Sequence, residues 1–160
     1  MKIWLAADPG KAGAIAYIKD TGEKKAFPTP TIGKEYDRLA VRDLLVNIKN
    51  TGADLHFVIE NINSHSAKGR QTAFVMGKGV EMWFSMAVAL DIPYTAVAPQ
   101  TWQKEMWQGI QKQKNSKATS LIAVKGLFPT FDLTATDKAT IPHDGIVDAL
   151  LMAEYCRRKF

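Results

Sequence analysis

Four acidic residues stand where a strand is expected to end or a helix to begin, a pattern suited to binding a metal ion. Asp8 and Glu60 each follow a run of apolar residues. Asp144 and Asp148 lie four residues apart at the head of an apolar helical segment, so they share one helix face. Carboxylate oxygens are the ligands that Mg²⁺ and Mn²⁺ prefer in proteins. If the two strand ends meet, the four residues predict a divalent-metal site.

Such a site would be suited to cutting phosphodiester bonds. A pair of divalent ions can activate water on one side of the bond and stabilise the leaving oxygen on the other. Several carboxylates must converge for this chemistry, and their burial is costly unless cations compensate. The first two acids also have structural interpretations. Asp8 could start a turn before Pro9, and Glu60 could be solvated at a strand end.

The C-terminal acids and the neighbouring His143 also have two interpretations each. Asp144 could be a helix N-cap or a first-turn acid that the helix dipole favours. Asp148 interrupts an apolar run, but it could belong to a solvent-facing stripe with Glu154 or Tyr155. His143 could orient or deprotonate an attacking water, or it could hold the start of the helix. The residue types alone leave these alternatives open.

Hydrophobic periodicity and turn residues predict an α/β fold that carries these residues. We expect strands at 2–7, 14–18, 24–27, 55–59 and 93–97. We expect helices at 35–50, 71–90, 98–107 and 116–128, with Ser116 as an N-cap, and a last helix from 143. Short turns join the first three strands, which favours an antiparallel meander. The order predicts a mixed five-stranded sheet with helices on both faces.

The composition is typical of one globular domain. The chain has 160 residues, 46% of them hydrophobic, which suffices to bury a sizeable core. We therefore expect residues 1–160 to form a single domain. The lone cysteine, Cys156, cannot form an intramolecular disulfide, and we expect neither a signal peptide nor a membrane span. These features predict a soluble intracellular protein that is not secreted.

The charge balance favours a polyanionic partner. The chain carries 21 Lys and Arg residues against 16 Asp and Glu residues, which gives a net charge of +5. The candidates for DNA contact are Lys68, Arg70, Lys78, Lys112, Lys114 and Lys117. Ordinary solvated loops and helix faces are the alternative explanation for these basic clusters.

Five segments of the chain resemble the RuvC-type Holliday-junction resolvases of the ribonuclease H-like superfamily. The segments are LAADPG at 5–10 with Gly13 and Ala14, VIE at 58–60, MGKGVEMW at 76–83, VAPQTW at 97–102 and HDGIVDALL at 143–151. They occur in the family's order and cover nearly the whole chain. Within the family, the chain looks most like the compact branch found in phages and organelles.

The resemblance implies a homodimeric crossover junction endodeoxyribonuclease with a ribonuclease H-like fold. Such an enzyme makes paired symmetric nicks in four-way DNA junctions with a divalent cofactor, Mg²⁺, for which Mn²⁺ substitutes. By the resemblance, the metal-binding carboxylates are Asp8, Glu60, Asp144 and Asp148. The implied compartment is the cytoplasm of a bacterial or phage-infected cell, or an organelle.

Two positions depart from the pattern of the bacterial members. Their last two acids are commonly three residues apart, whereas the spacing here is four. They also tend to have an aromatic residue shortly after the glutamate, placed to stack on junction bases. This chain has Asn63, Ser64 and His65 there, and its nearest aromatic residue is Phe74.

Two other functions fit the same acids. A different ribonuclease H-like nuclease would act on an RNA–DNA hybrid or structured RNA, and a branched-DNA binding protein would not cut at all. The segment 74–86 leaves a further choice open. Its large apolar residues, including Met82 and Met86, surround the helix, which predicts either a dimer interface or a central core helix.

Overall fold

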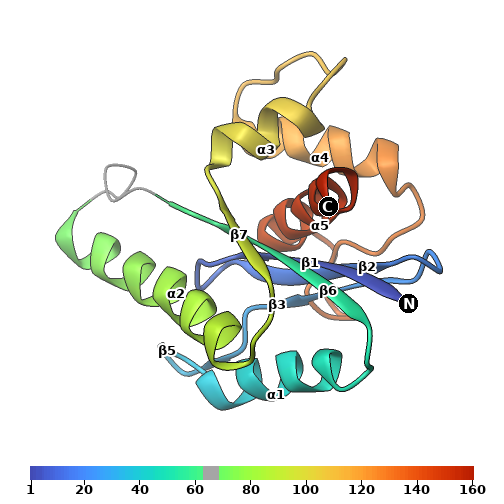
Figure 1. Ribbon diagram of the computed structural model, residues 1–160. Helices are drawn as coiled ribbons and strands as arrows, with labels where there is room; N and C mark the ends of the chain where they lie inside the picture. Colours follow the sequence, from blue (N-terminus) through green and yellow to red (C-terminus); the bar gives the residue numbers. More distant parts are fainter. Residues whose placement is uncertain (63–68) are drawn as a thin grey trace.

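A five-stranded sheet with helices on both faces forms the body of the computed structural model, which describes residues 1–62 and 69–160 (Figure 1). The sheet has the order β3-β2-β1-β6-β7, from β1 (Lys2–Asp8), β2 (Ala14–Lys19), β3 (Lys24–Pro28), β6 (Asp54–Glu60) and β7 (Tyr94–Val97). The short strands β4 (Thr31–Ile32) and β5 (Glu35–Tyr36) pair separately. The helices are α1 (Arg38–Lys49), α2 (Arg70–Ala89), α3 (Pro99–Met106), α4 (Ser116–Leu127) and α5 (Asp144–Lys159). The predicted mixed sheet is confirmed.

Pairing within the sheet follows the expected topology. Strands β1, β2 and β3 form an antiparallel meander, while β6 pairs parallel to β1 and β7 parallel to β6. The central strands β1 and β6 read as nearly continuous apolar runs because helices cover both of their faces. Since β1 and β6 run parallel, their carboxyl ends lie at the same edge of the sheet.

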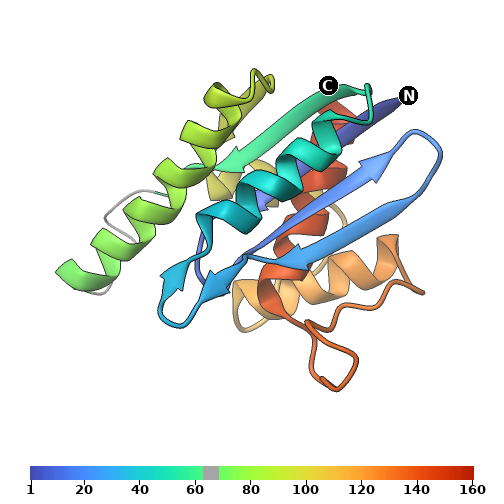
Figure 2. The same ribbon diagram turned by 90° about the horizontal axis from the view of Figure 1, so that it is seen from below.

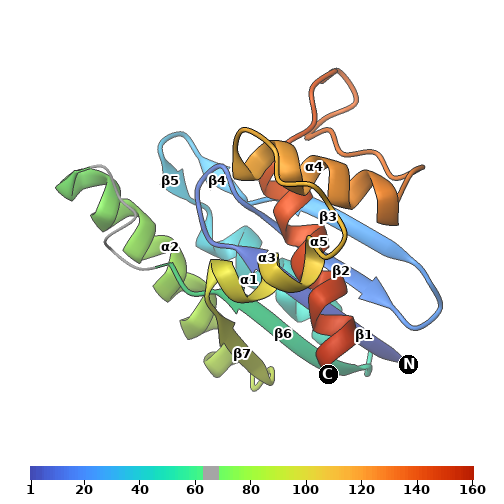
Figure 3. The same cartoon turned by 90° about the horizontal axis from the view of Figure 1, so that it is seen from above.

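The two faces of the sheet hold two separate hydrophobic cores. Figure 2 shows α1 and α2 on one face, where Leu5 of β1 packs with Leu45 and Trp83. Figure 3 shows α3, α4 and α5 on the other face, where Ala6 of β1 packs with Leu150. Alternate residues of one strand therefore serve different cores. None of the helices within 1–62 and 69–160 is long and apolar enough to cross a membrane.

The predicted helix at 35–50 is wrong in its first turn. Residues 35 and 36 belong to β5, and α1 begins at Arg38. Tyr36 is buried, and its hydroxyl donates toward the carbonyls of Pro9 and Val75, both 3.3 Å away. Asp37 then caps α1, its Oδ1 accepting from the backbone N–H three residues on at 2.9 Å. Long-range packing of Tyr36 thus overrides local helix periodicity.

The predicted N-cap of α4 is wrong by one residue. Ser116 is the first helical residue, and Asn115 is the cap. The Oδ1 of Asn115 accepts from the backbone N–H three residues on at 2.9 Å. Asn and Ser are equally good caps, so composition could not separate two adjacent candidates.

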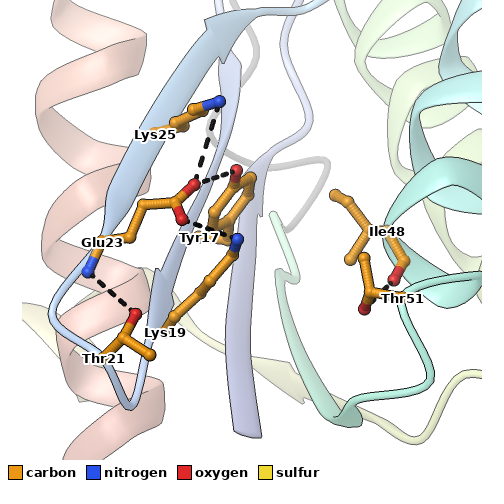
Figure 4. A network of polar contacts seen from close by, with 7 residues as sticks. All are labelled: Tyr17, Lys19, Thr21, Glu23, Lys25, Ile48 and Thr51. Carbon is orange, nitrogen blue, oxygen red and sulfur yellow. Dashed lines mark hydrogen bonds and ion pairs between the residues drawn. The ribbon is translucent and has the colours of Figure 1, made fainter. Parts of the chain in front are cut away.

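At the edge where β1 begins, the polar groups of the β2–β3 hairpin have protein partners. Glu23 accepts hydrogen bonds from Tyr17 at 3.1 Å and Lys19 at 2.7 Å, and Lys25 lies 3.8 Å away (Figure 4). Burial and the Glu23 carboxylate raise the pKa of Tyr17 to about 12. The charge of Glu23 is therefore matched by donors of the protein itself. The candidate metal-binding acids Asp8 and Glu60 lie at the opposite edge, where β1 and β6 end.

Candidate active site

The carboxyl ends of β1 and β6 bring two of the four acids together. Ala7 pairs with Ile59 in the parallel register, and Asp8 and Glu60 are the next residues on the two strands. Both side chains alternate onto the sheet face that α5 covers, as Ala6 and Val58 do. The prediction that the two strands are neighbours is confirmed.

The start of α5 packs directly on the turn that follows Asp8. A Cβ at Gly145 would meet the carbonyl oxygen of Ala12 at 2.5 Å and the carbonyl carbon of Gly13 at 2.6 Å. Only a glycine permits this approach, because real Cβ atoms do not come so close to backbone. Asp144 is the first residue of α5 and Asp148 stands one turn later, so this contact brings both toward Asp8.

The same turn is held from the other side of the sheet. Gly79 of α2 sits against it, since a Cβ there would lie 2.1 Å from the carbonyl oxygen of Pro9. The turn that carries Asp8 is therefore fixed between α2 and α5.

Asp148 is a half-buried acid that its surroundings only partly satisfy. Its Oδ1 is buried and has no hydrogen-bond partner among residues 1–62 and 69–160. Burial raises the pKa of Asp148 to about 7; a hydrogen bond from Ser120 opposes the shift, and the charges of Asp8 and Asp144 add to it. The alternative of a solvent-facing stripe with Glu154 is wrong, because Glu154 is buried.

Glu60 is buried, with only 9% of its surface exposed, so the solvated alternative is wrong. Its Oε1 accepts a hydrogen bond from Trp102 Nε1 at 2.8 Å. Burial and the charge of Asp8 raise the pKa of Glu60 to about 7, although the Trp102 bond opposes the shift. Sequence reasoning missed Trp102 as a partner, although it ends the VAPQTW segment.

The interpretation of Asp8 as the start of a turn is confirmed. The Oδ1 of Asp8 accepts from the Gly10 N–H at 3.2 Å, so it does shape the turn. Burial raises the pKa of Asp8; the Gly10 bond and the nearby His143 lower it, and the charge of Asp144 raises it further. The charge of at least one other acid contributes to raising the pKa of Asp8, of Glu60 and of Asp148. The four acids, Asp8, Glu60, Asp144 and Asp148, therefore form one cluster of interacting charges.

Asp144 stands at the exposed rim of this cluster. It is a first-turn acid, and the N-cap alternative is wrong because His143 is the cap, with Nδ1 accepting from the Ile146 N–H at 3.2 Å. Asp144 forms an ion pair with Lys117 of α4, whose pKa that contact raises. Lys117, predicted as a DNA contact, therefore lies at the edge of the acidic cluster.

The donor chemistry of the cluster suits a hard divalent cation, but the cluster is not a preformed ligand set. Within the described parts of the chain, no group of three or more His, Cys, Asp or Glu side chains is arranged as a metal-binding site. The buried Oδ1 of Asp148 without a partner and the raised pKa values of three acids nevertheless mark uncompensated negative charge. A cation would supply the missing compensation.

The remaining basic candidates occupy two stretches of the surface. Lys112 and Lys114 are exposed between α3 and α4, close in sequence to Lys117. Arg70 begins α2 and is exposed, and Lys78 of α2 is paired with Glu35 at 2.7 Å. Lys68 and the segment from Asn63 to His65 lie outside the described residues. DNA contact by any of these residues stays a prediction.

No protein-family model matches the sequence, and no curated protein matches it. Among solved structures, the chain is similar to RuvC of Thermus thermophilus in complex with a Holliday junction substrate. That similarity has a TM-score of 0.57 at 12% identity, over 94% of this chain and 90% of that chain. A second structure of Thermus thermophilus RuvC gives a TM-score of 0.55 at 16% identity, over 96% of each chain. The fold of the chain is therefore the RuvC-type, ribonuclease H-like fold, while its place in the compact phage and organelle branch stays a prediction.

Proposed function

We propose that residues 1–160 form a single nuclease domain that resolves four-way DNA junctions by metal-dependent hydrolysis, with paired symmetric nicks. The observation that carries this proposal is the set of buried and half-buried, poorly compensated carboxylates at one edge of the sheet. Three of them have raised pKa values, and one keeps an unpartnered oxygen. Such charges are costly without a counterion, so their retention is explained by a cation and an anionic substrate. The setting is the cytoplasm of a bacterial or phage-infected cell, or an organelle.

The metal-holding residues in this proposal are Asp8, Glu60 and Asp148, with Asp144 at the rim. Mg²⁺ is the expected ion and Mn²⁺ its substitute, because both prefer carboxylate oxygens. When bound, the ion lowers the pKa of a coordinated water and stabilises the leaving oxygen. The side chains must move closer together than they lie here to bind it, which the rotatable bonds of Asp144 and Asp148 permit.

The chain's own groups hold and orient the reacting parts. Trp102 fixes one oxygen of Glu60 and leaves the other for a ligand. Lys117 sets a positive charge beside the acids, where it would attract a phosphate. His143 uses Nδ1 to accept the cap hydrogen bond, so its neutral ring carries the proton on Nε2. In that tautomer it donates a hydrogen bond to water or phosphate and does not act as the base.

Paired cuts call for two active sites, and the surface of α2 offers a place for two copies to meet. Most of the large apolar residues of α2 do not face solvent. Met82 and Trp83 are buried in the core, and Met86 packs against it. An apolar patch on α2 and β7 consists of the exposed Val88 and Tyr94 and the half-buried Phe84. Val88 is 61% exposed, and the rings of Phe84 and Tyr94 lie 5.4 Å apart. This patch is the interface we assign to the homodimer.

A charge placed in the patch tests the dimer. Val88→Glu should give a folded monomer that nicks one strand at a time, because repulsion and desolvation would part the two copies. Ile122→Glu on α4, at a site that is also exposed, is the matched control and should stay dimeric. Analytical ultracentrifugation gives the assembly state, and a dimeric Val88→Glu protein would place the interface elsewhere.

The activity is tested with end-labelled four-way junctions, linear duplexes and RNA–DNA hybrids, in Mg²⁺, Mn²⁺, Ca²⁺ or EDTA. Nicks are mapped on every strand for the wild type, Asp148→Asn and Glu154→Gln. We expect paired nicks at the branch point in Mg²⁺ and Mn²⁺, retained by Glu154→Gln and lost by Asp148→Asn. Preferential cutting of the hybrid would identify a different nuclease of this fold. Tight junction binding without cutting in any metal would identify a binding protein.

A further inference from the structure

A cavity of about 250 Å³ lies on the outer side of α3, away from the face that carries Trp102. Its lining comes from one helix face and the segment that follows: Gln100, Gln103, Lys104, Trp107, Ile110 and Lys112. The first four stand at positions i, i+3, i+4 and i+7, so they form a continuous row. The chain then leads through Lys112 and Lys114 to Lys117 beside Asp144. The cavity and the acidic cluster are thus joined by a run of lysines.

The polar groups of this cavity have no partners in the described parts of the chain. The Nε1 of Trp107 is buried without a hydrogen-bond partner there. No hydrogen bond from the side-chain amides of Gln100 or Gln103, and no ion pair of Lys104 or Lys112, is found in residues 1–62 and 69–160. The amide and ammonium groups that line the cavity are exposed or half-buried, so they are open to a ligand that carries hydrogen-bond acceptors.

A second cavity, of about 380 Å³ beside Trp4, shows the contrast. The Nε1 of Trp4 is buried without a partner among the described residues, as that of Trp107 is. The three cations of this cavity are nevertheless matched, because Lys19 binds Glu23, Arg157 binds Glu154 and Lys24 donates to the Gly22 carbonyl. That cavity therefore has little unused charge for a ligand. The α3 cavity combines an aromatic wall, two free amides and two unpaired cations in one place.

We propose that the α3 cavity accepts an unstacked nucleobase of the DNA strand that leaves the branch point, with the flanking phosphates on Lys104 and Lys112. The site rests on the proposed junction activity and adds a base-recognition element to it. An indole wall offers a stacking surface, and glutamine amides can donate to and accept from base edges. The lysines bind phosphate as point charges without reading sequence.

The test measures binding of a labelled short oligothymidylate and of an abasic strand of equal length by fluorescence anisotropy in EDTA. We expect the wild type to bind the oligothymidylate about tenfold more tightly than the abasic strand. The double variant Gln100→Ala/Gln103→Ala should lose most of that preference. The double variant Lys104→Gln/Lys112→Gln should weaken binding of both strands and lower the salt dependence by about one unit per lysine. Lys125→Gln on α4 removes one positive charge outside the cavity; it is the control and should bind nearly like the wild type.

Equal binding of the two strands by the wild type would overturn the base site. A Gln100→Ala/Gln103→Ala protein that keeps the full preference would overturn it as well. All substitutions are at exposed or half-buried side chains, and thermal unfolding verifies that each variant is folded. Junction cutting by the wild type is measured separately, so loss of the base preference with intact cutting rejects the cavity and leaves the nuclease proposal standing.

Discussion

Helix α5 carries two acids with opposite surroundings, the half-buried Asp148 and the buried Glu154. Glu154 is 3% exposed, and both of its oxygens accept hydrogen bonds at 2.7 to 2.9 Å from Arg157 and Arg158. Burial opposes its ionisation, yet the two guanidinium groups hold the pKa of Glu154 below its ordinary value. Asp148, about 9 Å along the helix, has a buried oxygen without a partner and a pKa raised to about 7.

We interpret this difference as the contrast between a structural acid and a candidate functional one. Glu154 gains its partners from residues three and four positions on, in the geometry that one helix face provides. Asp148 instead lies near two other acids, Asp8 and Asp144, which raise its pKa; a hydrogen bond from Ser120 and the charge of Lys117 only partly oppose the shift. An acid that is retained in such a place destabilises the folded protein unless a ligand binds it, which is the property expected of a cation site.

Junction cutting should separate the two acids most strongly. Asp148→Asn keeps the shape of the side chain and removes the charge, so the rate of cutting should fall by about a hundredfold or more. Asp8→Asn should behave alike, whereas Glu154→Gln should cut at nearly the wild-type rate. Single-turnover rates on a labelled junction in Mg²⁺ provide the measurement. Wild-type cutting by Asp148→Asn would place the active site elsewhere.

The next largest effect concerns the contact that holds α5 against the Asp8 turn. Gly145→Ala forces a Cβ to within 2.6 Å of backbone atoms, so we expect a loss of at least about 2 kcal/mol of stability together with weaker cutting. Gly126→Ala in α4 is the control, because its Cβ would meet nothing within 4 Å. Denaturant unfolding gives both values. Equal stability of the two variants would mean that the helix start is free to shift.

The pH dependence of stability should reveal the unmatched acids. Because the pKa values of Asp148 and Glu60 are raised to about 7 in the folded protein, it binds more protons than the unfolded chain between about pH 4 and 7. These two groups therefore make the free energy of unfolding fall as pH rises through that window and level off above it. Asp148→Asn should flatten the slope by up to about 1.4 kcal/mol per pH unit. Unfolding in EDTA at several pH values tests this, and an unchanged slope would contradict the shifted pKa of Asp148.

The smallest expected effect is the change in the free energy of unfolding when Glu154, the matched acid, is neutralised. Glu154→Gln removes charged hydrogen bonds to two half-exposed arginines, so we expect a loss of about 1 kcal/mol, reduced by solvent screening. Asp148→Asn at pH 7 should leave the metal-free protein as stable as the wild type or more so. A Glu154→Gln protein that is more stable than Asp148→Asn would reverse the assignment of the two acids.

Much of the frame that carries the acids could be predicted from the sequence. Buried parallel strands such as β1 and β6 are uniformly apolar, so a carboxylate that ends each run is conspicuous. The pairing of those strands then determines that Asp8 and Glu60 are neighbours. Features fixed by contacts distant in the chain could not be predicted, such as the burial of Tyr36 against Pro9, which replaces the first turn of the predicted helix.

The partners of the acids were harder to predict than the acids themselves. Trp102 reaches Glu60 only because α3 packs on the sheet, and Lys117 reaches Asp144 only because α4 packs on α5. Nothing in local spacing indicates either contact. Glu154 could have been recognised as a structural acid, because Arg157 and Arg158 follow it at helical spacing. The catalytic and metal-binding roles of the four acids stay predictions.

The thermal unfolding midpoint in the presence and absence of Mn²⁺ tests most directly whether the unmatched acids form a cation site. A ligand that binds only the folded state stabilises it by RT ln(1 + [L]/Kd), so the midpoint rises with ligand concentration. We predict a clear rise with Mn²⁺ for the wild type and for Glu154→Gln, and little or none for Asp148→Asn. An equal rise in all three proteins would contradict the assignment of the metal site to the edge of the sheet where Asp8, Glu60 and Asp148 meet.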